Sequence, residues 1–379
     1  MIRIAIQMIT GDRFKYLALV AGVAFAALLI TQQGSIFNGY ANRTTAWLRD
    51  TAPADLWVMD EQVQMDNDPK AMSDTTLNRV RGVAGVEWAV PMYKDYLQAR
   101  LPDATLETVR VIGLDDATLI GGPRVVTGSL AALRQQGGVL VHADAGASPV
   151  LRDADGRAMA VGDRFSINDN EVRVVGTYEA TPEFFWEPVV YTTYTRALQI
   201  APRERKQLTY VLAKVRPDAD LKAVQSAINA VPGIKALTNA EFQQLTRDYV
   251  LSQTGILINF GITIALGFVI GLLASGQTFY TFVLENLRHF AALKAMGASN
   301  LVLLRMMFVQ VTFVSLLGFG VGVGVATLTG FAFRSASLAF EMTWHIPVFG
   351  LAGVLGCCLA AGGLSLIRVM RLEPAVVFK

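Results

Sequence analysis

The sequence predicts an α+β membrane protein with four transmembrane helices and a large polar domain between the first and the second. Hydrophobic residues make up 53% of the 379-residue chain and charged residues 17%, a balance between that of a soluble enzyme and that of a chain lying wholly in lipid. In addition, four windows contain no Asp, Glu, Lys or Arg, and each is longer than the roughly 20 residues that cross a bilayer as a helix. These windows are 16–42, 249–284, 306–333 and 342–367.

Lys and Arg residues near the spans predict the orientation, because cytoplasmic flanks retain positive charge during insertion. Nine such residues lie on the side of the N-terminus and four on the other side. We therefore expect both termini to be cytoplasmic. The alternative, a cleavable signal peptide in place of the first span, conflicts with the length of the first apolar run. The adjacent Cys357 and Cys358 are the only cysteines and lie in the last span, so no disulfide is expected in the polar domain.

Residues 39–247 are more than half of the chain and are expected to fold as one domain. Its flanks hold two similar halves: "ADLWVMDE" before "SDTTLNRVRGVAGVEWAVP", and "LTYVLAKVRP" before "ADLKAVQSAINAVPGIKALT". In each half a strand precedes a short amphipathic helix, a Gly (Gly85 or Gly233) ends the helix, and a β-branched residue (Val86 or Ile234) opens the next strand. This pattern predicts a ferredoxin-like α/β part over 50–124 and 206–240, with a small all-β insert over 125–205. The insert either contacts a partner or is a solvated elaboration.

The second apolar window is longer than a membrane requires, and helical character continues upstream through "NAEFQQLTRDYVLSQTG". A helix from Ala240 to Leu284 would be roughly 65 Å long. The pattern therefore predicts a stalk joined to the second transmembrane helix over 248–284. The alternative is a break near Gly255, with the upstream part packed on the domain.

The remaining segments follow from the same windows. Small residues four apart let helix backbones approach closely, within one subunit or between two. The candidate packing residues are Gly267, Gly271, Gly318, Gly320, Gly322 and Gly324. The expected segments are an amphipathic cytoplasmic helix (1–15), transmembrane helices 1, 3 and 4 (16–38, 301–333 and 347–367), an outer loop (334–346) and a cytoplasmic tail (368–379).

Several kinds of chemistry are excluded or disfavoured. The chain has no Gly-Lys dipeptide and therefore no Walker A phosphate loop. It has no Gly-x-Ser-x-Gly or His-Glu-x-x-His motif, and its three histidines are assigned to different regions, so neither a metal site nor a catalytic triad is expected. Charged residues are absent from the four windows, which disfavours a proton-driven carrier or an ion channel. Ser275 and Gln277 either line a polar path or bond to neighbouring helices.

The stretch "ENLRHFAALKAMGASN", residues 285–300, carries charge between two apolar windows. Leu287, Phe290 and Leu293 recur at helical spacing. Gly297 is expected to end the helix, and Ser299 or Asn300 to start the third span. This pattern alone predicts a short interfacial helix, with or without a partner.

With the residues that follow it, the stretch "ENLRHFAALKAMGASNLVLLRMMFVQ" and the Gly-rich "LLGFGVGVGVA" resemble the MacB/FtsX-like permeases of ABC transporters (type VII ABC fold) and in particular their DevC-like group. The layout is similar as well, from "ADLWVMD" after the first span, through "VGDRFSI" and "VRVVGTY" in the insert, to the tail "RLEPAVVFK". The resemblance covers nearly the whole chain.

The resemblance implies a non-catalytic, homodimeric permease in the bacterial inner membrane, with its large domain in the periplasm and its helices in contact with membrane lipids. A separate cytoplasmic ABC ATPase dimer would bind ATP and Mg²⁺ and drive export by mechanotransmission, so this chain would bind no cofactor itself. A HlyD-type periplasmic membrane-fusion adaptor and a TolC-like outer-membrane channel are the further expected partners, and nucleic acid is not expected. The alternatives are an FtsX-like regulatory anchor for a periplasmic enzyme and a lipoprotein-releasing permease.

By the same resemblance, residues 285–300 are the coupling helix that docks on the ATPase. Many relatives have an acidic residue where this chain has His289, which leaves the charge complementarity of the docking surface open. The substrate is not indicated. The expected coupling residues are Glu285, Arg288, His289, Phe290, Leu293, Lys294, Met296 and Gly297.

Overall fold

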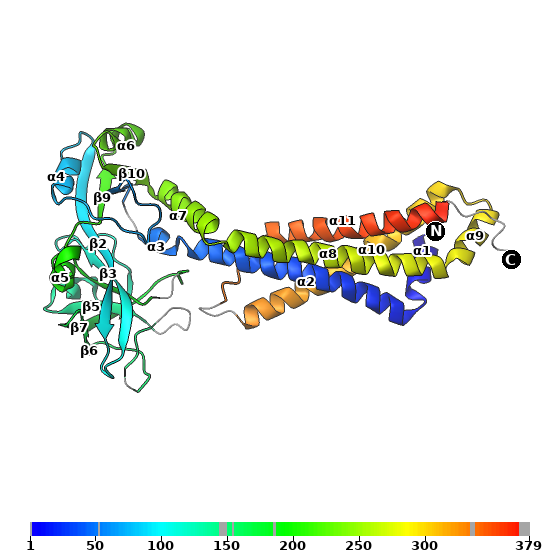
Figure 1. The fold of residues 1–379 in the computed structure, drawn as a ribbon, viewed down its shortest axis with the longest axis horizontal. Coiled ribbons are helices and arrows are strands. Elements are labelled where there is room, and N and C mark those ends of the chain that lie inside the picture. The colour runs from blue at the N-terminus through cyan, green and yellow to red at the C-terminus, as the bar shows by residue number, and fades with distance from the viewer. Residues whose placement is uncertain are drawn as a thin grey trace. The chain divides into compact units, whose positions relative to one another are not determined.

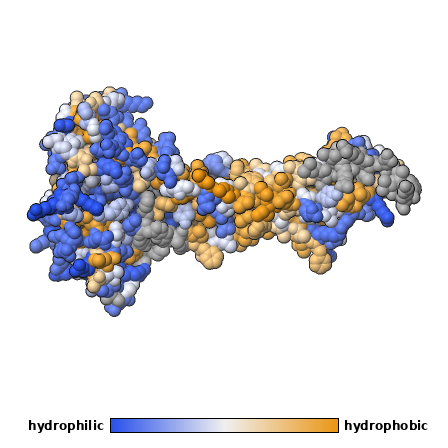
Figure 2. Space-filling model, in the orientation of Figure 1, coloured by the Kyte–Doolittle hydropathy of each residue, from blue (hydrophilic) through white to orange (hydrophobic). Residues whose placement is uncertain are grey.

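The computed structural model describes residues 2–51, 54–143, 150–153, 155–184, 187–333 and 338–370 (Figure 1). Two compact units make up the chain. The helical unit comprises Met1–Tyr40, Gly255–Arg334 and Leu338–Lys379, and the α/β unit comprises Ala41–Thr254. Figure 2 shows hydrophobic residues gathered over the helical unit and hydrophilic residues over much of the α/β unit.

Six helices form the described part of the helical unit. Four of them, α2, α8, α10 and α11, are long and apolar enough to cross a membrane, which confirms the predicted four spans. Their apolar side chains share one core with α1, in which Val23, Phe279 and Val314 are almost fully buried. The bounds are α1 Ile2–Thr10, α2 Arg13–Arg43, α8 Ile256–Glu285, α9 Leu287–Ala295, α10 Asn300–Ala332 and α11 His345–Met370.

The first and last strands of the α/β unit form the predicted ferredoxin-like arrangement. Strands β1 (Leu56–Asp60), β2 (Val86–Arg100), β9 (Tyr210–Val215) and β10 (Ile234–Thr238) pair antiparallel in the order β10-β1-β9-β2. Helix α4 (Thr75–Arg81) joins β1 to β2, and helix α6 (Leu221–Asn229) joins β9 to β10. The prediction of a split βαβ sandwich is therefore confirmed.

Gly85 and Gly233 lie where the chain turns into β2 and β10. Their φ angles are +94° and +80°, in the region where a Cβ atom is strained. The two predicted turn glycines are therefore required by the backbone.

The insert differs from its prediction in extent and content. β2 is 15 residues long and continues past its pairing with β9, so that Tyr93–Arg100 pair with β3. The strands are continuous through β2; the part beyond its pairing with β9, which we call the second sheet, includes the end of β2 and β3 and therefore starts before residue 125. It also holds a helix, α5, and two parallel pairings, β3 with β8 and β5 with β7. The elements are β3 Leu106–Leu114, β4 Arg124–Gly128, η1 Leu130–Arg134, β5 Gly138–His142, β6 Arg164–Ile167, β7 Asn170–Glu179, β8 Val189–Thr193, α5 Tyr194–Ile200 and η2 Arg203–Arg205.

The prediction of one continuous helix from Ala240 to Leu284 is wrong. Helix α7 (Asn239–Gln253) starts with a capping box between Thr238 and Glu241 and ends before Gly255, whose φ is +66°. A left-handed residue cannot continue a right-handed helix, so α8 starts afresh at Ile256. Phe242, Thr246 and Val250 of α7 are buried in the α/β unit, as the alternative of a break near Gly255 requires.

Other boundaries shift by a few residues. The first span starts at Arg13 and runs through Gly34 and Gly39 to Arg43, beyond the predicted bounds of 16–38. Of the predicted outer loop, residues 338–344 precede α11 without forming a helix. The predicted tail beyond residue 370 lies outside the described residues.

Candidate functional site

Helix α9 is set off from its neighbours at both ends. α8 ends before Asn286, whose side-chain Nδ2 donates to the carbonyl oxygen of Phe282 at 2.9 Å. At the other end, the Gly297 amide donates to the Lys294 oxygen and the Ala298 amide to the Leu293 oxygen, both at 3.0 Å. With φ of +95° at Gly297, these two bonds form a Schellman motif. The predicted stop at Gly297 and restart near Ser299 are confirmed.

One face of α9 is anchored on the other helices. Phe290 is fully buried and packs in an apolar cluster with Val283 of α8 and with Leu303 and Met307 of α10. Met8 of α1 packs against the same cluster. Burying a Phe side chain stabilises by about 1.5–3 kcal/mol, so α9 is held firmly against three helices.

The opposite face of α9 is open. Arg288, His289, Ala295 and Met296 are exposed and lie within two helical turns on one side, and we call them the α9 outer face. Met296 is 76% exposed and is the large apolar side chain of this face. The eight predicted coupling residues therefore differ in position: Phe290 is an internal anchor, Leu293 and Lys294 are partly buried, Arg288, His289 and Met296 are on the outer face, Gly297 is in the stop, and Glu285 is the last residue of α8.

An ion cluster lies beside the start of α9. The Lys15 ammonium is 2.6 Å from Glu285 and 3.2 Å from Asp12, with all three side chains about half exposed. Exposed ion pairs contribute only about 0–1 kcal/mol each, so this cluster aligns α2 with the end of α8 more than it stabilises the fold. A cavity of about 180 Å³ opens next to it and is lined in part by Gln277.

The N-terminal helix α1 is fixed to α10. The Gln310 side chain is buried and its Nε2 donates to the Ala5 carbonyl oxygen at 2.8 Å. A buried polar bond of this kind specifies one position for α1. Together α1, α9, the start of α2 and α10 and the last turn of α8 form one assembly, which we call the α9 end.

Four of the six predicted packing glycines lie against α2. A Cβ atom on Gly271 would be 2.9 Å from the Ala26 Cβ, and one on Gly318 would be 2.6 Å from Val23. Gly267 similarly faces Ile30, and Gly322 faces the Ala24 backbone. The helices α8 and α10 thus both contact α2 closely. Gly320 and Gly324 have no such neighbour within 4 Å among the described residues.

Ser275, one of the two polar residues singled out in the second span, is part of this packing. Its buried hydroxyl lies 3.4 Å from the Cys358 sulfur of α11. The contact joins two helices and favours the interpretation of Ser275 as a packing residue.

In the α/β unit, the segment after α2 and the segment before α8 contact each other. Helix α3 (Ala46–Asp50) lies against α7, and the Asn239 side chain of α7 donates to the Leu48 carbonyl oxygen at 2.9 Å. Trp47 of α3 stacks edge-on against Trp57 of β1, with ring centres 5.2 Å apart, and Phe242 of α7 contacts the same Trp57 ring. We call this the α3–α7 junction.

A buried ion cluster, which sequence reasoning missed, supports the junction. The Lys94 ammonium of β2 lies 3.2 Å from Asp66 and 3.6 Å above the Trp47 ring. Arg110 of β3 pairs with Glu183 at 2.6 Å and donates to Asn67 at 2.8 Å. Lys94 and Arg110 are at most 1% exposed. The available signal was a cation among apolar and aromatic residues in the middle of each strand, in "PMYKDY" and in "TVRVI".

Burial governs the electrostatics of this cluster. Removal from water lowers the pKa of Lys94 to about 8, although Asp66 opposes the shift. Removal from water also raises the pKa of Glu183 above its usual range, with Arg110 opposing. Among the described residues, no group of three or more His, Cys, Asp or Glu side chains could hold a metal ion.

Two family models match the chain. The model of the MacB-like periplasmic core domain matches residues 17–231, more than half of the chain, and the model of the FtsX-like permease C-terminal region matches residues 260–374. The chain belongs to the MacB/FtsX-like family of ABC transporter permeases. Members of the MacB/FtsX-like family are membrane subunits that work with an ATPase.

Solved structures similar to this MacB/FtsX-like permease cover about half of it. The extracellular domain of the noncanonic ABC-type transporter YknZ from Gram-positive bacteria is 12% identical, with 49% of this chain and 99% of that chain covered and a TM-score of 0.35. The periplasmic region of MacB from Actinobacillus actinomycetemcomitans is 10% identical, with 52% and 94% covered and a TM-score of 0.38. A domain of a putative permease from Porphyromonas gingivalis is 13% identical, with 48% and 86% covered and a TM-score of 0.32. No curated protein matches this chain.

Proposed function

We propose that this permease passes ATP-driven movement from ATPase subunits docked on α9 to its α/β unit, for export. The observation that carries the proposal is the two-faced α9, with Phe290 buried among three helices and the outer face open. Close-packed side chains move as a body, so a displacement of α9 is passed to α8 and α10.

The α3–α7 junction supports the second half of the proposal. In the chain, α2 is followed by α3, and α7 is followed by α8. Because α3 and α7 contact each other, a relative movement of α2 and α8 acts on the domain at one place. The α3–α7 junction is the point at which the movement of the spans is received.

Docking on α9 is tested by co-purifying the full chain with its ATPase. Met296→Asp puts a charge into the outer face and is expected to reduce association at least tenfold. Leu106→Asp is the matched control, because Leu106 is also exposed, at 62%, but lies at the start of β3. His289→Glu places an acidic side chain on the outer face, and its effect on association measures the charge complementarity of the docking surface. Unchanged association of the Met296→Asp variant would refute docking on α9.

We also propose that the α9 end is cytoplasmic and the α/β unit periplasmic in a bacterial inner membrane. The excess of Lys and Arg on the α9 side supports this orientation. The test introduces Met296→Cys or Leu106→Cys into a chain with Cys357 and Cys358 replaced by Ser, and treats intact cells with a membrane-impermeant thiol reagent. Labelling of the Leu106→Cys variant but not of the Met296→Cys variant is expected, and the reverse pattern would reverse the orientation.

We also propose that the chain forms a homodimer through the side of α10 that holds Gly320 and Gly324. Gly320 and Gly324 have no neighbour within 4 Å in the described chain, and Val321 and Leu328 beside them are 53% and 73% exposed. Two small residues four apart suit close contact with another helix in lipid. Gly324→Leu is expected to lower the fraction of cross-linked dimer in membranes, whereas Gly261→Leu on α8, also without neighbours, serves as the control.

The finer assignment rests on the resemblance to the DevC-like group. We propose export with a HlyD-type adaptor and a TolC-like outer-membrane channel. Co-purification of an adaptor with the full chain supports this assignment. Recovery of a cell-wall hydrolase instead would favour regulation of a periplasmic enzyme, and recovery of bound lipoprotein would favour lipoprotein release.

A further inference from the structure

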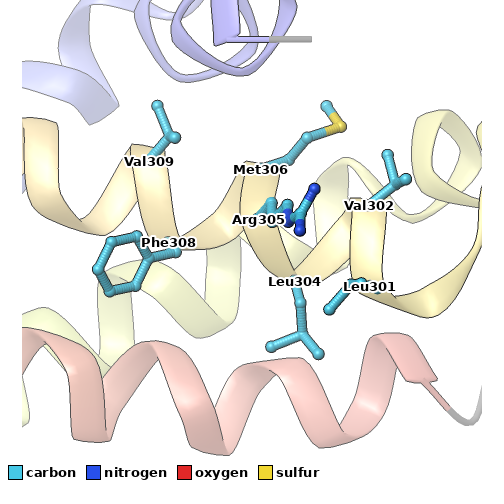
Figure 3. Close-up of a pocket in the computed structure, with 7 residues that line it drawn as sticks. All are labelled: Leu301, Val302, Leu304, Arg305, Met306, Phe308 and Val309. Carbon is cyan, nitrogen blue, oxygen red and sulfur yellow. The ribbon is translucent and has the colours of Figure 1, made fainter.

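A groove of about 490 Å³ runs along the first turns of α10. Figure 3 shows its lining side chains projecting from this one helix, with Leu301 and Leu304 pointing toward α11 and Met306 pointing to the other side. Leu301 and Phe308 are 57% and 58% exposed, which leaves an open apolar surface. In a protein that crosses a membrane, such a surface meets lipid or another protein.

Arg305 lies in the middle of this apolar groove. Its guanidinium is exposed, and it makes no ion pair with any side chain that the structure describes. Lys15, at the same end of the helical unit, is instead paired with Asp12 and Glu285. The groove therefore combines an apolar wall with one cation that lacks an anion.

The position of Arg305 along α10 indicates what it meets in a bilayer. α10 has 33 residues, and at 1.5 Å per residue this is about 50 Å. The hydrocarbon core is only about 30 Å thick, so a centred helix leaves about 10 Å at each end among the headgroups. Arg305 is the sixth residue of α10, about 8 Å from its start, and so lies at the level of the lipid phosphates.

We propose that this groove binds an anionic phospholipid. Arg305 holds the phosphate, since a guanidinium can donate two parallel hydrogen bonds to phosphate oxygens. One acyl chain lies along Leu304 and Phe308 toward the bilayer centre. An anionic headgroup is favoured over a zwitterionic one because the Arg305 charge has no other counter-charge in the described chain. The inference depends on membrane insertion and not on export or ATPase docking.

The experiment measures lipid retention by native mass spectrometry of the full chain in detergent. The protein is incubated with mixed micelles that hold equal amounts of phosphatidylglycerol and phosphatidylcholine. One Arg near an anionic surface contributes about 1 kcal/mol, or roughly fivefold in affinity. Arg305→Gln is therefore expected to lower phosphatidylglycerol retention about fivefold. Phosphatidylcholine retention stays unchanged, and Arg305→Lys keeps most of the selectivity.

Lys15→Gln is the matched control, because it removes a cation that already has partners, and its retention of phosphatidylglycerol is expected to equal that of the wild type. If Arg305→Gln lowers the unfolding temperature, Leu304→Glu provides the test instead, since its carboxylate repels the lipid phosphate. The proposal is overturned if Arg305→Gln retains phosphatidylglycerol like the wild type, or if both lipids are lost equally. It is also overturned if only ATPase association or dimer formation changes, since the groove would then be a protein-docking surface.

Discussion

The Nδ2 atom of Asn239 donates a hydrogen bond to the carbonyl oxygen of Leu48, 2.9 Å away, and so links α7 to α3. Asn239→Ala removes this bond and is expected to cost about 1 kcal/mol of unfolding free energy. Denaturant unfolding of the full chain in detergent measures the loss. Asn170→Ala, which removes an exposed bond in the second sheet, is the control and should change little. Equal effects of the two variants would contradict a special role of the α3–α7 junction.

Phe290 and Met296 are expected to separate anchoring from docking. Phe290→Ala empties a fully buried position and should cost about 3–5 kcal/mol. Met296→Ala removes an exposed side chain and should change the unfolding free energy by less than about 0.5 kcal/mol. Thermal unfolding of both variants in detergent provides the measurement. A large loss in the Met296→Ala variant would mean that this side chain is not free on the outer face.

Replacing a glycine is expected to destabilise the protein more where another helix lies against that glycine. Gly318→Val would push a side chain into Val23 of α2, and overpacking of this kind costs about 1–3 kcal/mol. Gly363→Val in α11 is the control, because a Cβ atom there meets nothing within 4 Å. Unfolding temperatures of the two variants are compared. A Gly318→Val variant as stable as the control would argue against close α2–α10 packing.

Replacing Gly255 or Gly261 with Ala is expected to change the unfolding free energy in opposite directions. Neither glycine has a neighbour within 4 Å, but Gly255 has a φ of +66° and Gly261 lies within α8. Gly255→Ala should destabilise by about 1 kcal/mol because of left-handed strain. Gly261→Ala should stabilise by up to about 1 kcal/mol, since Ala favours a helix. Stabilisation by both substitutions, measured in the same unfolding assay, would indicate that α7 and α8 can form one helix.

The Lys94–Asp66 pair is expected to matter more than a surface pair. Lys94→Met leaves the buried Asp66 carboxylate without its cation and should cost about 3–5 kcal/mol. Arg164→Met breaks an exposed pair with Glu171 and should cost less than about 1 kcal/mol. Adding Asp66→Asn to the Lys94→Met chain should recover part of the loss. Denaturant unfolding of the four proteins, the wild type included, tests the ranking, and a loss from Arg164→Met as large as that from Lys94→Met would contradict it.

Local patterns were sufficient for much of the architecture. Charge-free windows predicted the spans because a charge in hydrocarbon is costly wherever the helix lies. The repeated strand–helix–Gly pattern predicted the ferredoxin-like arrangement of β1, β2, β9 and β10, and Gly297 predicted the end of α9. Each of these features depends on residues that are close in sequence.

The residues of the coupling helix show what such local patterns do not predict. Helical spacing placed Leu287, Phe290 and Leu293 on one apolar face of the helix. Only packing against α8 and α10 buries Phe290 completely and leaves Met296 exposed. In the same way, six glycines had similar patterns, yet only the position of α2 separates Gly318 and Gly322 from Gly320 and Gly324.

Long-range partners were decided by the tertiary structure alone. Lys94 bonds to Asp66, 28 residues away in the sequence, and Arg110 bonds to Asn67, 43 residues away. These bonds form because β2 and β3 place both cations next to the segment that follows β1. The sequence by itself determined which segments cross a membrane, which form strands and where the chain turns, since these depend on local composition and backbone conformation. Which face of a helix is buried, and which charge meets which, depends on elements that come together only when the chain folds.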